Sequence, residues 1–185
     1  KGLEIINNET GRLYNMVEEL LDFSRLQNGR IRMDCRPLDL VAELTDAVLF
    51  CEARIQREGL VLVYNEPEEM IPVYADPDRL RQVFINILDN AIKYSPNYGE
   101  IGVRISEGPE TLAVTITNYG PDIPKDKVSR IWGKFYQADE SHSSEGNGIG
   151  LAVVKQVVQL HGGTATVDSG SGSTTFTVEL PKQEE

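Results

Sequence analysis

Residues 76–95 of the chain read DPDRLRQVFINILDNAIKYS and predict a single amphipathic helix. Asp76 supplies a capping carboxylate and Pro77 suits the first helical position, while Ser95-Pro96-Asn97 ends the segment. Apolar residues recur three and four apart, which is the spacing of a core-facing helix surface. These core candidates are Leu80, Val83, Phe84, Ile87, Leu88, Ala91 and Ile92. The segment is therefore expected to pack as a buried helix from about 77 to 94.

Three polar residues of this helix fall on one face, roughly opposite the apolar centre. Asn86, Asn90 and Lys93 are four and three residues apart, so their side chains are neighbours on a helix. The face would present two amides and one ammonium group. A lone Asn-x-x-x-Asn pair is more often a solvated stripe than a ligand site, so the surrounding motifs must distinguish the two interpretations.

The segments around this helix predict an α+β fold. We expect further helices at 3–27, 38–59 and 149–160, with a short one near 125–131. Strands are expected at 30–36, 60–65, 71–75, 100–107, 111–118, 164–169 and 173–180. Runs of strands mixed with helices favour a two-layer α/β sandwich.

The first helix, 3–27, carries an apolar stripe that it cannot bury alone. Ile6, Leu13 and Leu20 are seven residues apart, with Met16 and Phe23 at the alternate heptad positions. Such a stripe needs partner helices. None is obvious in this chain, so we expect an upstream helix, a second subunit, or both.

A glycine-rich run, EGNGIGLA at residues 145–152, precedes the helix expected at 149–160. Alternate glycines let backbone amides approach a ligand closely, and a helix start favours anions. The run therefore suits phosphate, although alone such a run is more often a mobile loop.

Composition limits the classes of function. The formal net charge of −11 argues against nucleic-acid binding. No apolar run reaches the roughly 18 residues of a membrane span, and no signal peptide is recognisable at the start. Cys35 and Cys51 lack metal-ligand spacing and are interpreted as reduced thiols.

Four motifs in order resemble those of histidine kinases, within the wider family that also holds gyrase, Hsp90 and MutL. Asn86 to Ser95 resembles the N box, residues 118–124 (NYGPDIP) the G1 box, 133–139 (GKFYQAD) the F box and 145–152 the G2 box. The resemblance implies a Bergerat-type ATP-binding fold: a mixed, mostly antiparallel sheet with helices on one face. The segment 137–146 would be a lid over the nucleotide.

The resemblance also implies roles for individual residues. Asn90 would ligate Mg²⁺, Lys93 would meet a phosphate, and Tyr94 would pack on the base of ATP. The remaining nucleotide-binding candidates are Asn118, Gly120, Ile123, Lys134, Phe135, Gly146, Gly148, Ile149, Gly150 and Leu151. ATP-hydrolysing relatives have a glutamate base where Asn86 stands; because an amide cannot take that proton, phosphoryl transfer is favoured over hydrolysis.

Three positions depart from the family pattern. Asn118 replaces the aspartate that accepts a hydrogen bond from adenine, and an amide oxygen can still accept it. Asp122 replaces a glycine, and Gln137 stands where many members have arginine. These changes leave open a second interpretation, a nucleotide-binding or scaffolding module without efficient transfer. A third is a serine-kinase or ATPase relative, which the helix 3–27 argues against.

The resemblance implies two parts: residues 1–29 as the second helix of a dimerisation and phosphotransfer hairpin, and residues 30–185 as the catalytic domain. ATP would phosphorylate a histidine that lies upstream of this chain, in the same or the partner subunit of a homodimer. The phosphoryl group would then pass to a response-regulator aspartate. His142 and His161 lack the context of the acceptor. We expect a cytoplasmic location, within a membrane-anchored receptor, and no membrane contact by this part.

Overall fold

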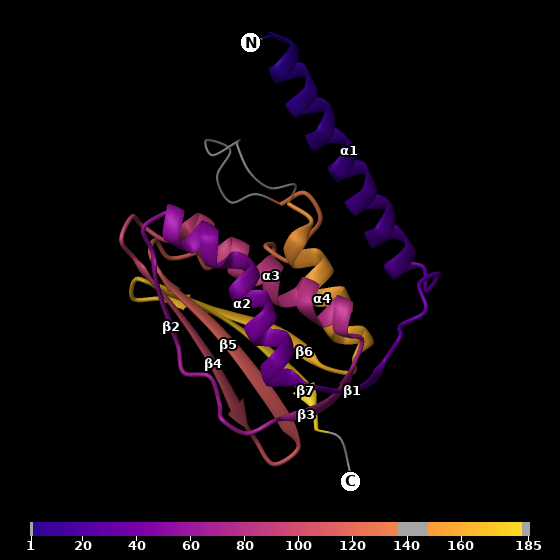
Figure 1. Ribbon diagram of the computed structural model, residues 1–185, viewed down its shortest axis with the longest axis vertical. Helices are drawn as coiled ribbons and strands as arrows, with labels where there is room; N and C mark the ends of the chain where they lie inside the picture. The colour runs from indigo at the N-terminus through magenta and orange to yellow at the C-terminus, as the bar shows by residue number, and fades with distance from the viewer. Residues whose placement is uncertain (1, 137–147, 183–185) are drawn as a thin grey trace.

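The computed structural model describes residues 2–136 and 148–182 and shows a two-layer α+β sandwich with one long helix outside it (Figure 1). The five-stranded sheet has the order β2-β4-β5-β7-β6, and a separate small sheet pairs β1 with β3. The helices are α1 (Gly2–Gln27), α2 (Leu40–Arg57), α3 (Pro77–Tyr94) and α4 (Gly150–Leu160). The strands are β1 (Arg36–Asp39), β2 (Val61–Tyr64), β3 (Pro72–Ala75), β4 (Glu100–Glu107), β5 (Thr111–Tyr119), β6 (Thr164–Gly170) and β7 (Ser173–Pro181).

The predicted fold class is confirmed. Only the β2–β4 pair of the large sheet is parallel within the described ranges, and its other pairs are antiparallel. Helices α2, α3 and α4 cover one face of this sheet (Figure 1). The opposite face carries cross-strand polar pairs such as Thr117 and Thr175, whose hydroxyls lie 2.8 Å apart. One face is therefore core and the other polar, as antiparallel sheets allow.

The core face predicted for α3 is confirmed. All seven core candidates of that helix are buried, and Phe84 and Leu88 have no exposed surface. The helix packs against α2 on one side and α4 on the other, above β5. Its polar face is thereby held at the centre of the helical layer.

Two predicted elements are not formed. Residues 30–35 are not a strand: pairing with β3 begins only at Arg36, and the amide of Asp34 donates to the Asp76 carboxylate (2.9 Å). Residues 125–131 form turns rather than a helix. There the amides of Lys127 and Val128 both bond the Pro124 carbonyl, so successive helical hydrogen bonds do not develop.

Asp76 ties three segments together at the start of α3. One carboxylate oxygen caps the helix at the amide of Arg79 (3.1 Å), and the other holds the linker at Asp34. The Asp76 amide donates to His161 Nε2 (3.0 Å). His161 Nδ1 then carries the proton and donates to the Val157 carbonyl (2.8 Å). His161 thus joins the end of α4 to the start of α3.

Among the described residues, the buried side chains of helix α1 lie in its last turns. Phe23 and Leu26 are 3% and 1% exposed, and Arg79 donates to both oxygens of Asp22 (2.5 and 3.0 Å). This ion pair raises the pKa of Arg79. Farther out, apolar side chains including Leu13 and Val17 are more than half exposed. Among the residues described, no helix is both long enough and apolar enough to cross a bilayer.

The buried thiol of Cys51 gives a testable prediction. Burial raises its pKa from 9.0 to about 11, so the folded chain holds the thiol proton more tightly than the unfolded chain does. At pH 8 we expect iodoacetamide to leave Cys51 unmodified until the chain is unfolded in urea, as measured by mass spectrometry. The same shift makes stability fall as pH rises from about 9 towards 11.

Cys35 is the internal control for this experiment. It is less buried than Cys51, and burial raises its pKa without a comparably large shift. We therefore expect Cys35 to react first. Equal alkylation of both thiols in the folded chain would contradict the prediction.

Candidate functional site

The polar face of α3 lies against the start of α4 rather than in open solvent. Asn86, Asn90 and Lys93 are all half-buried. Asn86 donates through Nδ2 to the Gly150 carbonyl (3.2 Å), and a Cβ on Gly150 would lie 3.7 Å from Asn86 Cγ. The interpretation of this face as a plain solvated stripe is therefore wrong for Asn86.

The other two polar residues of α3 lie farther along this face. Within the described residues, the side-chain amide of Asn90 has no hydrogen-bond partner. The Lys93 ammonium lies 5.3 Å from the centroid of the Tyr94 ring, which is 37% exposed. An amide oxygen, an ammonium group and a partly exposed aromatic ring are thus available within five residues.

The end of β5 approaches the end of α3. Asn118 is only 3% exposed, yet its side-chain amide forms no hydrogen bond to a described residue. A Cβ on Gly120 would lie 2.6 Å from the Tyr94 carbonyl and 3.7 Å from Asn118 Nδ2. No side chain fits at that separation, so Gly120 lets the G1-like segment pass directly beside the N-box-like helix. Ile123, farther on, is half-buried against the core.

The F-like and G2-like segments also meet. Gly148 has a φ of +67°, and its Cβ would lie 2.8 Å from the Phe135 carbonyl carbon. Phe135 itself has a positive φ of 59° and is 57% exposed. Ile149 is buried and Leu151 half-buried, and the side chain of the N-cap residue Ile149 makes no hydrogen bond to the first amides of α4. The first amides of a helix are a favourable position for an anionic group.

Lys134 lies on the side of α1. Its ammonium donates to Gln27 Oε1 (2.6 Å) and sits 4.9 Å from the centroid of the Phe23 ring. Both of these partners belong to α1 and not to the predicted nucleotide site. The predicted role of Lys134 in nucleotide binding thus stays a prediction.

Some predictions fall outside the described residues. These are Gly146, Gln137, His142 and the lid segment 137–146 as a whole.

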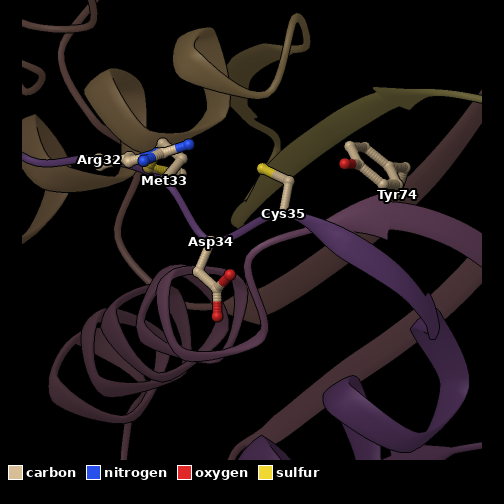
Figure 2. A pocket seen from close by; sticks show the side chains of 5 residues that line it. All are labelled: Arg32, Met33, Asp34, Cys35 and Tyr74. Atoms are coloured by element: carbon tan, nitrogen blue, oxygen red, sulfur yellow. The ribbon is translucent and has the colours of Figure 1, made fainter.

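A hollow of about 350 Å³ lies elsewhere, where the linker passes β3. Figure 2 shows its lining residues, with the side chains of Asp34 and Cys35 pointing in opposite directions. Arg32, Met33 and Tyr74 complete the lining. None of these residues belongs to the predicted nucleotide site, and the hollow is open to solvent. The convergence of α3, β5 and α4 is the better candidate, because it brings separate motifs together.

Comparison with known proteins identifies the family of the chain. A family model described as histidine kinase-, DNA gyrase B-, and HSP90-like ATPase matches residues 75–184. The chain belongs to this family. The match begins one residue before the cap of α3 and includes every predicted nucleotide-binding residue from Asn86 to Leu151.

Two relatives that match most of this chain are sensor kinases. The sensor histidine kinase WalK of Bacillus subtilis (strain 168) is 32% identical over 188 residues, which cover 99% of this chain and 31% of the relative. The adaptive-response sensory kinase SasA of Synechocystis sp. is 33% identical over 156 residues, covering 83% and 40%. The chain thus spans well under half of these relatives. The resemblance to the ATP-binding region of sensor histidine kinases is confirmed.

Solved structures of the family share the fold. Full-length ShkA in complex with AMPPNP matches with a TM-score of 0.83 at 27% identity, over 96% of this chain and 37% of that one. Histidine kinase ThkA in complex with the response regulator protein TrrA matches with a TM-score of 0.78 at 25% identity, over 97% and 50%. Both matches extend over nearly the whole chain, α1 included.

One contact of the site was not predicted. Asp122, noted in the sequence only as a departure from glycine, accepts a hydrogen bond from the amide of Gly172 (2.8 Å). The two residues are 50 positions apart. No local pattern signals such a pairing, because it depends on the antiparallel placement of β7 beside β5.

Proposed function

We propose that this chain is the ATP-binding catalytic region of a sensor histidine kinase. It would transfer the γ-phosphoryl group of ATP to a histidine on a helix outside this chain. The observation that carries the proposal is the convergence of Asn86, Tyr94, Gly120 and Gly150 around one face of α3. Membership in the ATPase family supports ATP as the nucleotide.

Asn90 is the proposed ligand for Mg²⁺. Mg²⁺ prefers hard oxygen ligands and is usually bound by one or two protein groups together with substrate phosphates. The side-chain amide oxygen of Asn90 is half-buried and has no hydrogen-bond partner among the described residues, so it fits that requirement. When bound, the ion would neutralise charge on the phosphates. The described residues contain no cluster of three or more His, Cys, Asp or Glu that could hold a metal by itself.

The two ends of the nucleotide are assigned to different elements. The side-chain amide oxygen of Asn118 would accept a hydrogen bond from the adenine amino group, beside Gly120 and the Tyr94 ring. The first backbone amides of α4, which the Ile149 side chain does not cap, would receive the phosphates together with Lys93. Asn86 would hold α4 at its distance from α3 through the Gly150 carbonyl. Transfer then depends mainly on positioning and charge neutralisation.

The acceptor and partners are proposed from α1 and the relatives. Residues 1–29 are the second helix of a phosphotransfer hairpin, and residues 30–185 are the catalytic domain. The exposed apolar residues of α1, such as Leu13 and Val17, would pack against the helix with the acceptor histidine and against a second subunit. A similar kinase is known in complex with a response regulator protein, which supports a receiver domain as the next acceptor. We place this catalytic region in the cytoplasm, as part of a membrane-anchored receptor.

The test has two stages. First, the chain is titrated by calorimetry with a non-hydrolysable ATP analogue, with and without Mg²⁺. Second, labelled ATP and a separately produced hairpin with the acceptor histidine are added, and phosphohistidine is measured. Magnesium-dependent binding with transfer supports the kinase proposal. Binding without transfer favours the nucleotide-binding scaffold, and no binding at millimolar nucleotide overturns both.

Asn118→Ala gives a prediction within this titration. Removing the amide takes away the proposed hydrogen bond to adenine and leaves the base unpaired, so affinity should fall by about tenfold. Asn118→Asp restores a carboxylate acceptor and should bind at least as tightly as the wild type. An Asn118→Ala variant with unchanged affinity would show that Asn118 does not read the base.

A further inference from the structure

The loop after β5 is joined to the β6–β7 hairpin by three hydrogen bonds, two at the turn residue Gly172 and one at Ser169 of β6. The Gly120 amide donates to the Gly172 carbonyl (3.0 Å), and the Gly172 amide donates back to Asp122 Oδ1 (2.8 Å). The Ile123 amide donates to Ser169 Oγ (2.8 Å). Two of the proposed nucleotide-binding residues, Gly120 and Ile123, are thus held through backbone amides by a hairpin that contributes no proposed binding residue.

The backbone of the turn between β6 and β7 is fixed by strand pairing on both sides. β6 and β7 pair up to Gly170 opposite Ser173, and the two turn residues Ser171 and Gly172 have φ values of +56° and +80°. This left-handed pair is typical of a tight two-residue hairpin turn. Ser169 is further fixed by Thr174, whose hydroxyl lies 2.7 Å from Ser169 Oγ. The Gly172 amide and carbonyl are therefore held in place by strand pairing.

The same hairpin lies beside Asn118. In the register of β5 and β7, Asn118 is opposite Thr174, which is 4% exposed, and Tyr119 is opposite Ser173. Asp122 is four residues beyond Asn118, so its bond to the Gly172 amide closes a loop that leaves β5 and returns to the turn between β6 and β7. Gly120 lies inside this closed loop, against the Tyr94 carbonyl.

We propose that Asp122 is a positioning residue for the base end of the nucleotide site. Its carboxylate accepts the hydrogen bond that joins Gly172 to the segment 120–123. This bond fixes the distance between the segment and Tyr94. A glycine at position 122 could not make this bond. The inference rests on the proposed function, because it assigns Asn118, Gly120 and Tyr94 to the base.

Asp122→Ala tests the proposal by comparing two competitors. Each variant of the full chain is titrated with a fluorescent ATP analogue, which is displaced by ADP or by inorganic tripolyphosphate, both with Mg²⁺. ADP uses the base and phosphate ends, whereas tripolyphosphate uses only the phosphate end. Loss of one charge-assisted hydrogen bond should weaken ADP by about three- to tenfold, and tripolyphosphate affinity should not change.

Matched variants separate positioning from general stability. Asp122→Asn keeps an oxygen acceptor and should restore most of the ADP affinity. Asp126→Ala removes an exposed carboxylate four residues away and should leave both ligands unaffected. Ser169→Ala removes the neighbouring bond to Ile123 and should weaken ADP in the same direction as Asp122→Ala.

The outcomes are distinct. Unchanged ADP affinity in Asp122→Ala, or an equal loss for ADP and tripolyphosphate, would overturn the positioning role while leaving the proposed function intact. Failure of the wild-type chain to bind the analogue would overturn the proposed function, and the inference with it. A loss for ADP alone, restored by Asp122→Asn, supports the inference.

Discussion

Asn90→Ala should lower the affinity for the magnesium–nucleotide complex by roughly a hundredfold, because alanine removes a direct metal ligand and even outer-shell changes cost 10- to 100-fold. Affinity measured without Mg²⁺ should change little. We expect this effect because the side-chain amide of Asn90 is half-buried and forms no hydrogen bond to a described residue. It also lies on the face of α3 where the motifs converge. The fold should survive, since alanine is the best helix former.

Calorimetry with an ATP analogue, with and without Mg²⁺, measures this effect. Asn65→Ala is the matched control, since Asn65 is exposed and lies outside the family's binding motifs. Circular dichroism confirms that both variants are folded. If Asn90→Ala retained wild-type dependence on Mg²⁺, the metal would have to be held elsewhere, and the assignment of the polar face of α3 would be wrong.

Phe84→Ala should destabilise the chain by about 3–5 kcal/mol, which is the usual cost of removing a fully buried phenyl group. Phe84 has no exposed surface and lies in the middle of α3, which packs between α2 and α4 above β5. The cost includes lost apolar burial and the cavity left behind. Phe84 lies on the face of α3 opposite the proposed site, so its removal takes away no contact to the nucleotide. Nucleotide binding should therefore weaken only because fewer molecules are folded.

Urea unfolding followed by circular dichroism measures the free energy of unfolding. Phe50→Ala is the matched control on α2, because Phe50 is 72% exposed and its removal should change stability by less than about 0.5 kcal/mol. A similar loss in both variants would mean that α3 is not the centre of the core.

Elements with a strong period were predictable from sequence. The apolar spacing of residues 77–94 and the capping pair Asp76-Pro77 gave α3 with its boundaries, and all of its core residues are buried. The strands expected at 111–118 and 173–180 likewise correspond to β5 and β7, each to within one residue. These elements are recognisable because each one's pattern is set by a single periodicity against one buried layer.

Features that depend on distant partners were not predictable. Residues 30–35 alternate like a strand, but the Asp34 amide is taken by Asp76 instead of a neighbouring strand. Motif order grouped Lys134 with the phosphate-binding residues, yet its ammonium bonds Gln27 on α1. The bond from Asp122 to Gly172 also spans the chain. Each of these contacts is decided by tertiary geometry, which no local window of sequence contains.

The burial of the last turns of α1 against the domain has a mechanical consequence. From Asp22, which is held by Arg79, to its first turn the helix reaches about 30 Å at 1.5 Å per residue. A pivot of only 10° about that anchor would carry the far end through roughly 5 Å at this length. A small displacement of the N-terminal end of α1 would therefore change the forces on the Asp22–Arg79 ion pair. Because Arg79 lies in the first turn of α3, the displacement would reach the helix that carries Asn90.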